Sequence, residues 1–147
     1  MRQMRQVDRS ALVPYTPEQM FALVADIERY PQFVPWVKSS KVLQQDERGV
    51  IGQLEMERGG VKEKFTTRNV LEPPLRMSLA LVDGPFRLLD GLWTFEPLGQ
   101  KGTKIRLTIR FEFANPLTAM LLSRTFEKSC GELVDSFVER AREVYGT

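Results

Sequence analysis

Apolar and polar residues alternate without interruption between Lys104 and Phe113. Successive side chains of a strand point to opposite faces, so this segment is predicted to be a half-buried antiparallel strand. A strand over about residues 3–13 has an ambiguous face. Weaker alternation predicts further strands over residues 36–44, 50–56, 62–71, 77–81 and 89–95.

Two segments show the period of a helix. Thr16-Pro17-Glu18-Gln19 combines a capping residue, an N-terminal proline and a glutamine at the third position, which predicts a helix over about residues 16–27. Asn115-Pro116 repeats this signal before a long apolar stripe that stops at Gly146, so one helix of about 30 residues is predicted there. Gly131 inside it indicates either close approach of a strand or ligand, or a kink.

The order of these elements predicts the fold class. Turn residues separate the strands too closely for helical crossovers, so hairpins are expected. One α+β domain over residues 1–147 follows, with about six to seven antiparallel strands and a long C-terminal helix covering one face of the sheet. Tyr30-Pro31 and Val34-Pro35 bound a proline-rich turn, interpreted as either a lid or a connector.

Composition narrows the chemistry. The 147 residues are 42% hydrophobic, with a net charge of +2 that does not indicate DNA binding. The sequence has no histidine and a single cysteine, which excludes an intrachain disulfide, a cysteine zinc cage and histidine-dependent catalysis. Cys130 lies on the apolar stripe of the long helix and is predicted to be buried and unreactive. No secretion signal or apolar run of about 18–20 residues is present, so a soluble cytoplasmic protein is expected.

Acidic residues are the few candidates for catalysis. Glu55 and Glu57 lie on the polar face of their strand, which is typical of solvated charges. Asp90 follows a slip in the strand period between Phe86 and Leu89, as at a bulge, and a bulge can redirect a side chain. No partner acid, metal-ligand set or phosphate loop accompanies it. The sequence therefore predicts no catalytic residue, metal or cofactor.

Several segments resemble the RatA and coenzyme-Q-binding START-domain family. The most specific block is LVADIERYPQFVPW over residues 23–36, and GLWTF over residues 91–95 also matches. DGPF (83–86), FEF (111–113) and VDSF (134–137) extend the resemblance over nearly the whole chain. It implies a helix-grip fold of the START/Bet v 1-like kind, in which a curved antiparallel sheet wraps around the C-terminal helix and encloses an apolar cavity.

The resemblance implies three different functions. The first is binding of a hydrophobic molecule, ubiquinone or a similar lipid, in support of quinone function in respiration. The second is a ribosome-associating toxin that binds the large ribosomal subunit and blocks subunit joining. The third is a polyketide cyclase-like enzyme, which would require an acid–base pair that this sequence barely offers. We therefore favour a non-enzymatic lipid-binding module.

Large apolar side chains fall on the faces that alternation assigns to the interior. An ordinary core explains any one of them, but a sheet wrapped around one helix has few other elements to fill its interior. The predicted ligand-binding residues are Phe33, Trp36, Met56, Phe65, Leu79, Phe86, Trp93, Phe95, Phe111, Phe113, Phe126, Leu133 and Phe137.

Two surfaces suggest partners. The candidates for ribosome contact lie on the polar face of one strand and are Lys104, Arg106 and Arg110. Together with Lys62, Lys64 and Arg68 they would form a basic outer surface. The alternative is that all six are ordinary solvated charges. Leu117, Met120, Leu121 and Leu122 widen the apolar arc of the long helix. They would guard the cavity mouth or make transient membrane contact, unless Leu122 packs against residues 30–36.

Overall fold

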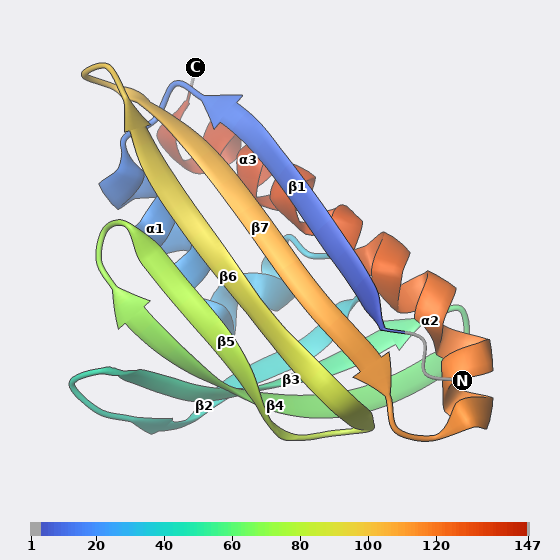
Figure 1. Ribbon diagram of the computed structural model, residues 1–147. Coiled ribbons are helices and arrows are strands. Elements are labelled where there is room, and N and C mark those ends of the chain that lie inside the picture. The colour runs from blue at the N-terminus through green and yellow to red at the C-terminus, as the bar shows by residue number, and fades with distance from the viewer. Residues whose placement is uncertain (1–3, 147) are drawn as a thin grey trace.

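The computed structural model describes residues 4–146 and has one seven-stranded antiparallel sheet with helices packed on its concave face (Figure 1). The strands are β1 (Arg5–Val13), β2 (Val37–Gln45), β3 (Gly49–Arg58), β4 (Val61–Glu72), β5 (Arg76–Asp83), β6 (Phe86–Leu98) and β7 (Gly102–Phe113). Their order in the sheet is β1-β7-β6-β5-β4-β3-β2. Figure 1 shows the sheet bending, so that β3 and β4 run at a steep angle to β6 and β7. The predicted fold class is confirmed.

Strand pairing follows the hairpin order expected from the sequence. Each strand from β2 to β6 pairs with the next strand in the chain, and β1 pairs with the last strand, β7. On β7, Ile105, Leu107 and Phe111 are fully buried, whereas Arg106 and Arg110 between them are exposed. The register shift in β6 between Phe86 and Leu88 confirms the predicted bulge.

The face of β1 was ambiguous because charged and apolar residues share it. Val7 and Val13 are buried, and Arg5 and Arg9 alternate with them on the same face. Arg5 reaches past the core to the Glu127 carboxylate, 2.6 Å away. The long side chain of arginine therefore lets a charged residue lie on the helix-covered face, because its guanidinium reaches a partner at the edge of the core.

The first helical segment is shorter than expected and continues as a different helix. Helix α1 (Pro17–Ala25) carries the predicted capping box, in which the Thr16 side chain accepts from the Gln19 backbone and the Gln19 side chain accepts from Thr16. The 3₁₀ helix η1 (Ile27–Gln32) follows and contains Pro31. The Tyr30 hydroxyl donates to the Val24 carbonyl, which ties η1 back to α1.

The prediction of one C-terminal helix of about 30 residues is wrong. Helix α2 (Pro116–Gly131) and helix α3 (Leu133–Tyr145) are separated at Glu132 and follow one another along β1 (Figure 1). Both features that Gly131 was expected to indicate are present: the helix is interrupted beside Gly131, and Gly131 faces β1. A Cβ at Gly131 would lie 3.4 Å from the guanidinium of Arg9. Among the described residues, no helix has the length and hydropathy needed to cross a bilayer.

Candidate functional site

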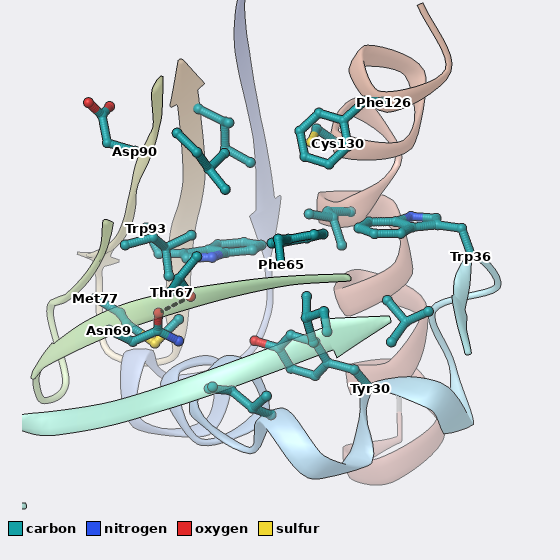
Figure 2. Close-up of a pocket in the computed structure, with 18 of the residues that line it drawn as sticks. Tyr30, Trp36, Phe65, Thr67, Asn69, Met77, Asp90, Trp93, Phe126 and Cys130 are labelled. Carbon is teal, nitrogen blue, oxygen red and sulfur yellow. Dashed lines mark hydrogen bonds between the residues drawn. The ribbon is translucent and has the colours of Figure 1, made fainter. Parts of the chain in front are cut away.

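A mostly apolar cavity of about 60 Å³ lies between the concave face of the sheet and the helices (Figure 2). Its walls come from η1, the start of β2, strands β3 to β7 and both C-terminal helices. The lining residues are Ile27, Tyr30, Trp36, Val37, Gly52, Leu54, Phe65, Thr67, Asn69, Met77, Leu79, Leu89, Asp90, Trp93, Ile109, Phe126, Cys130, Leu133 and Phe137.

Seven of the thirteen residues predicted to bind ligand border this cavity, namely Trp36, Phe65, Leu79, Trp93, Phe126, Leu133 and Phe137. The structure places the other six away from it, namely Phe33, Met56, Phe86, Phe95, Phe111 and Phe113. Alternation predicts which face of the sheet a side chain lies on, but it does not predict which positions along a strand border the cavity.

The six other residues serve the core around the cavity. Phe86, Phe111 and Phe113 surround Phe126 at one end, with ring centroids 5.1, 4.8 and 5.9 Å from its own. Three more lie outside the cavity wall: Phe95 packs against Phe21 of α1, Met56 is buried, and Phe33 is partly exposed beneath the Arg140 guanidinium. In this structure these six residues support the wall and do not line the cavity, and their contact with a ligand stays a prediction.

Sequence reasoning missed a polar pair within the apolar wall. Thr67 and Asn69 follow Phe65 at alternate positions of β4 and border the cavity with it. The Thr67 hydroxyl donates to the Asn69 side-chain carbonyl at 2.7 Å, and Asn69 is buried (Figure 2). The alternation of β4 would have revealed both, because they share the face of Phe65.

The Trp36 indole places an unpartnered donor in the wall. Trp36 is 4% exposed, and its Nε1 has no hydrogen-bond acceptor in the part of the chain that the structure describes. An unpaired buried donor costs about 1–3 kcal/mol relative to a paired one. Figure 2 shows Trp36 and Trp93 on opposite sides of the cavity. The site therefore combines apolar walls with a donor that lacks an acceptor.

The proline-rich segment after α1 closes one side of the cavity. Ile27 and Tyr30 of η1 line it together with Trp36. Burial, with a smaller contribution from Asp26, raises the pKa of Tyr30, whose hydroxyl is already bound to the Val24 carbonyl. The segment therefore packs as one wall of the cavity, in the position that a closed lid would occupy.

Two ionisable lining residues, Asp90 and Cys130, are respectively ion-paired and buried, and the candidate glutamates of β3 lie outside the lining. The Asp90 carboxylate points away from the cavity (Figure 2) and accepts hydrogen bonds from Arg110 at 3.0 and 2.7 Å. Burial, with a smaller contribution from Glu127, raises the pKa of the Cys130 thiol. Glu55 and Glu57 bond with Ser39 and Lys38, across the pairing of β3 with β2. Among residues 4–146, no group of three potential metal-ligating side chains occurs.

The basic outer surface is smaller than expected and is charge-paired. Arg106 bonds to Asp8, and Arg110 bonds to Asp90. Lys104 lies on the same strand face, but Lys62, Lys64 and Arg68 belong to β4, which β5 and β6 separate from β7. Strand order therefore divides the predicted surface into two groups.

The apolar arc at the start of α2 divides as well. Leu122 is buried, and α2 packs against β1 and β7. Leu117, Met120 and Leu121 are exposed by 60%, 74% and 64%. These three side chains form a contiguous apolar feature at the surface of the helix.

Comparisons with known proteins place the chain in a family. A model described as polyketide cyclase / dehydrase and lipid transport matches residues 13–138. The chain is 41% identical over 140 residues to ribosome association toxin RatA of Pseudomonas aeruginosa, covering 95% of this chain and 97% of that protein. It is 29% identical over 138 residues to the mitochondrial coenzyme Q-binding protein coq10 of Schizosaccharomyces pombe, covering 90% and 84%.

Solved structures agree on the fold. Zhui aromatase/cyclase from Streptomyces superimposes with a TM-score of 0.84 at 18% identity, covering 97% of this chain and 96% of that one. An 18 kDa protein from Caulobacter crescentus superimposes with a TM-score of 0.77 at 29% identity, covering 97% and 99%. The first likeness concerns the fold alone, since identity is low. Sequence and architecture together show that this chain belongs to the polyketide cyclase / dehydrase and lipid transport family, with RatA proteins among its relatives.

Proposed function

We propose that this protein binds a hydrophobic small molecule whose head group accepts hydrogen bonds, with a quinone carrying an isoprenoid tail as the favoured class. The unpartnered Trp36 N–H in an apolar cavity wall carries this proposal. A quinone carbonyl would accept from that N–H and relieve the cost of burying it unpaired. Likeness to a protein named coenzyme Q-binding supports the same ligand class.

The rest of the wall suits an apolar tail. Leu54, Met77 and Leu133 present flexible side chains, and each methylene transferred from water to such a wall contributes about 0.8 kcal/mol. Asn69, already paired with Thr67, is a second polar group beside the cavity. No charged group is needed to hold such a ligand, and no catalytic step is proposed.

Uptake requires the cavity to widen. Its volume of about 60 Å³ is below the roughly 300 Å³ at which small-molecule pockets begin. We therefore propose that the existing cavity receives the head group and that side chains of the wall repack around the tail. Met77 is suited to this, because methionine adapts its shape at low cost.

A filled cavity tests this proposal. Leu133→Trp places an indole inside the wall, and Val144→Trp places one on the exposed side of α3 as the matched control. Binding of decyl-ubiquinone is measured by equilibrium dialysis at matched thermal stability. Wild type and Val144→Trp should bind one equivalent, and Leu133→Trp should bind about tenfold more weakly. Equal uptake by Leu133→Trp and wild type would overturn the cavity assignment. If Leu133→Trp does not fold, Leu79→Phe on the opposite wall is used in its place.

Ribosome association is the second candidate function. Relatives named ribosome association toxin RatA, including that of Escherichia coli at 39% identity, match 97% of this chain. We propose Lys104, Arg106 and Arg110 as the contact residues, in competition with the carboxylates that now hold the two arginines. Binding to rRNA phosphates would then require exchange of these ion pairs.

Ribosome cosedimentation tests the second candidate. Arg106→Glu with Arg110→Glu should weaken pelleting with large subunits and flatten its salt dependence, because fewer counterions are released. Asp8→Asn with Asp90→Asn removes the carboxylates that pair with both arginines and should strengthen pelleting with large subunits. Wild type that fails to pellet even at low salt would remove this candidate.

A further inference from the structure

We propose that the outer face of α2 docks this protein onto an anionic lipid bilayer. Leu117, Met120 and Leu121 lie within the first two turns of the helix and are exposed by 60%, 74% and 64%. Single exposed leucines are common, but three on adjacent turns leave a continuous apolar surface in water.

The same helix face becomes cationic one turn later. Residues three and four apart lie above one another on a helix, so Arg124 and Lys128 continue the row that begins with the three apolar residues. Both are exposed. An apolar tip followed by cations is the pattern of helices that lie at membrane surfaces, where apolar side chains insert and cations meet phosphates.

A hollow between α2 and β1 extends the cationic region. It is lined by Arg5, Arg9, Arg124, Glu127, Lys128, Gly131 and Glu132. Both acids are already neutralised, Glu127 by Arg5 at 2.6 Å and Glu132 by Arg58 at 3.1 Å. Arg9, Arg124 and Lys128 have no carboxylate partner among residues 4–146, which leaves this surface positive.

An anionic bilayer fits both halves of this surface. Headgroup phosphates would bind Arg124, Lys128 and Arg9, while the acyl boundary would receive the apolar tip. An RNA partner would satisfy the cations but leave the three apolar side chains in water. The inner face of α2 carries Phe126 and Cys130 at the cavity wall, so docking would bring the cavity to the place where hydrophobic ligands are found. Docking itself needs no ligand and goes beyond the proposed function.

Vesicle cosedimentation with the whole chain tests this docking. The probes are vesicles of phosphatidylcholine alone and of phosphatidylcholine with phosphatidylglycerol in a two-to-one ratio. Wild type should bind the anionic vesicles about tenfold more tightly than the neutral ones. Leu117→Ser with Met120→Ser and Leu121→Ser should lose about tenfold, as should Arg124→Gln with Lys128→Gln.

Matched controls remove the same chemistry elsewhere. Leu12→Ser with Leu43→Ser and Leu75→Ser replaces three other exposed leucines, and Lys62→Gln with Lys64→Gln removes two cations of β4. Both should bind vesicles as wild type does, and all variants should melt at similar temperatures.

Three results would overturn the proposal. The first is wild type that fails to bind anionic vesicles at low salt, and the second is a serine variant of Leu117, Met120 and Leu121 that binds as wild type does. The third is loss of ribosome pelleting with unchanged vesicle binding in the Arg124 and Lys128 variant, which would assign the surface to RNA. The filled-cavity variant Leu133→Trp should still bind vesicles, which separates a failure of docking from a failure of ligand binding.

Discussion

The Arg106 guanidinium donates two hydrogen bonds to the Asp8 carboxylate, at 3.0 and 2.7 Å, across the pairing of β1 and β7. These bonds hold the pKa of Asp8 below its ordinary value of 3.8. The folded pKa is therefore lower than the unfolded one. The pair favours folding above the unfolded pKa, and this contribution is lost as the pH falls through the folded value.

Replacing Arg106 should raise the pKa of Asp8. In Arg106→Gln, we expect the pKa of Asp8 to rise toward 3.8, observed by NMR titration of its side-chain carboxyl carbon. Arg110→Gln is the control, since Arg110 bonds to Asp90 and not to Asp8. An Asp8 titration that does not move in Arg106→Gln would show that the pair is not formed in solution.

Phe126 holds the aromatic cluster at one end of the cavity. Its ring centroid lies 4.8 Å from that of Phe111 and 5.8 Å from that of Phe65. Phe126→Ala should lower the free energy of unfolding by about 3–5 kcal/mol, because it removes a buried ring and leaves a void. Urea denaturation measures the loss. Phe33→Ala, at a partly exposed ring, should cost clearly less, and equal losses would contradict this placement of Phe126.

Two glycines should respond to alanine with opposite signs. A Cβ at Gly131 would lie 3.4 Å from the guanidinium end of the Arg9 side chain, and alanine favours helix by about 1 kcal/mol, so Gly131→Ala should stabilise the protein modestly. A Cβ at Gly49 would lie 1.9 Å from the backbone oxygen of Asn69. Gly49→Ala should therefore destabilise it, and thermal melts of the two variants compare the signs directly. A Gly131→Ala variant that melts lower would mean that the helix interruption needs glycine.

Much of the fold was predictable because local chemistry agrees with the tertiary structure. The alternation of β7, the Thr16 capping box and the slip at Phe86 each specify a feature that the structure contains. The interruption at Glu132 was less predictable, because the cap residue Glu132 has no side-chain capping bond there and an apolar stripe runs past it. A glycine alone indicates either a kink or a close contact, and here it accompanies both.

The candidate site was predictable only in part. Alternation placed Phe111 and Phe113 on the concave face, but packing against Phe126 turned that end of the interior into solid core. The pairing of Arg106 with Asp8 depends on β1 returning to β7 from about 100 residues away in sequence. No local pattern contains such a pairing.

The Cys130 thiol should resist modification in the folded protein. It is 1% exposed, and burial raises its pKa, so little reactive thiolate is present near neutral pH. Labelling with a thiol-specific disulfide reagent should be slow in buffer and complete in denaturant. Cys130→Ser should keep ligand uptake while losing about 1–3 kcal/mol of stability for the buried hydroxyl. Labelling of native protein as fast as that of a free thiol would show that this wall opens readily.

The Trp36 N–H should discriminate between ligands that have the same tail. Trp36→Phe removes the donor and keeps an aromatic ring beside Phe126, whose centroid lies 6.5 Å from that of Trp36. Decyl-ubiquinone should bind this variant about tenfold more weakly, the effect of losing one buried hydrogen bond. Decylbenzene has an equal tail and no acceptor, so its affinity should change little.

Trp93→Phe is the matched control for this comparison. Trp93 borders the opposite side of the cavity, and its replacement removes a similar ring area without removing the unpartnered donor. A weaker affinity for both ligands in Trp36→Phe would indicate lost packing instead of a lost hydrogen bond. Discrimination confined to the variant that lacks the Trp36 N–H would mean that this group binds the head of the ligand, because the tail, the ring area and the fold are held constant.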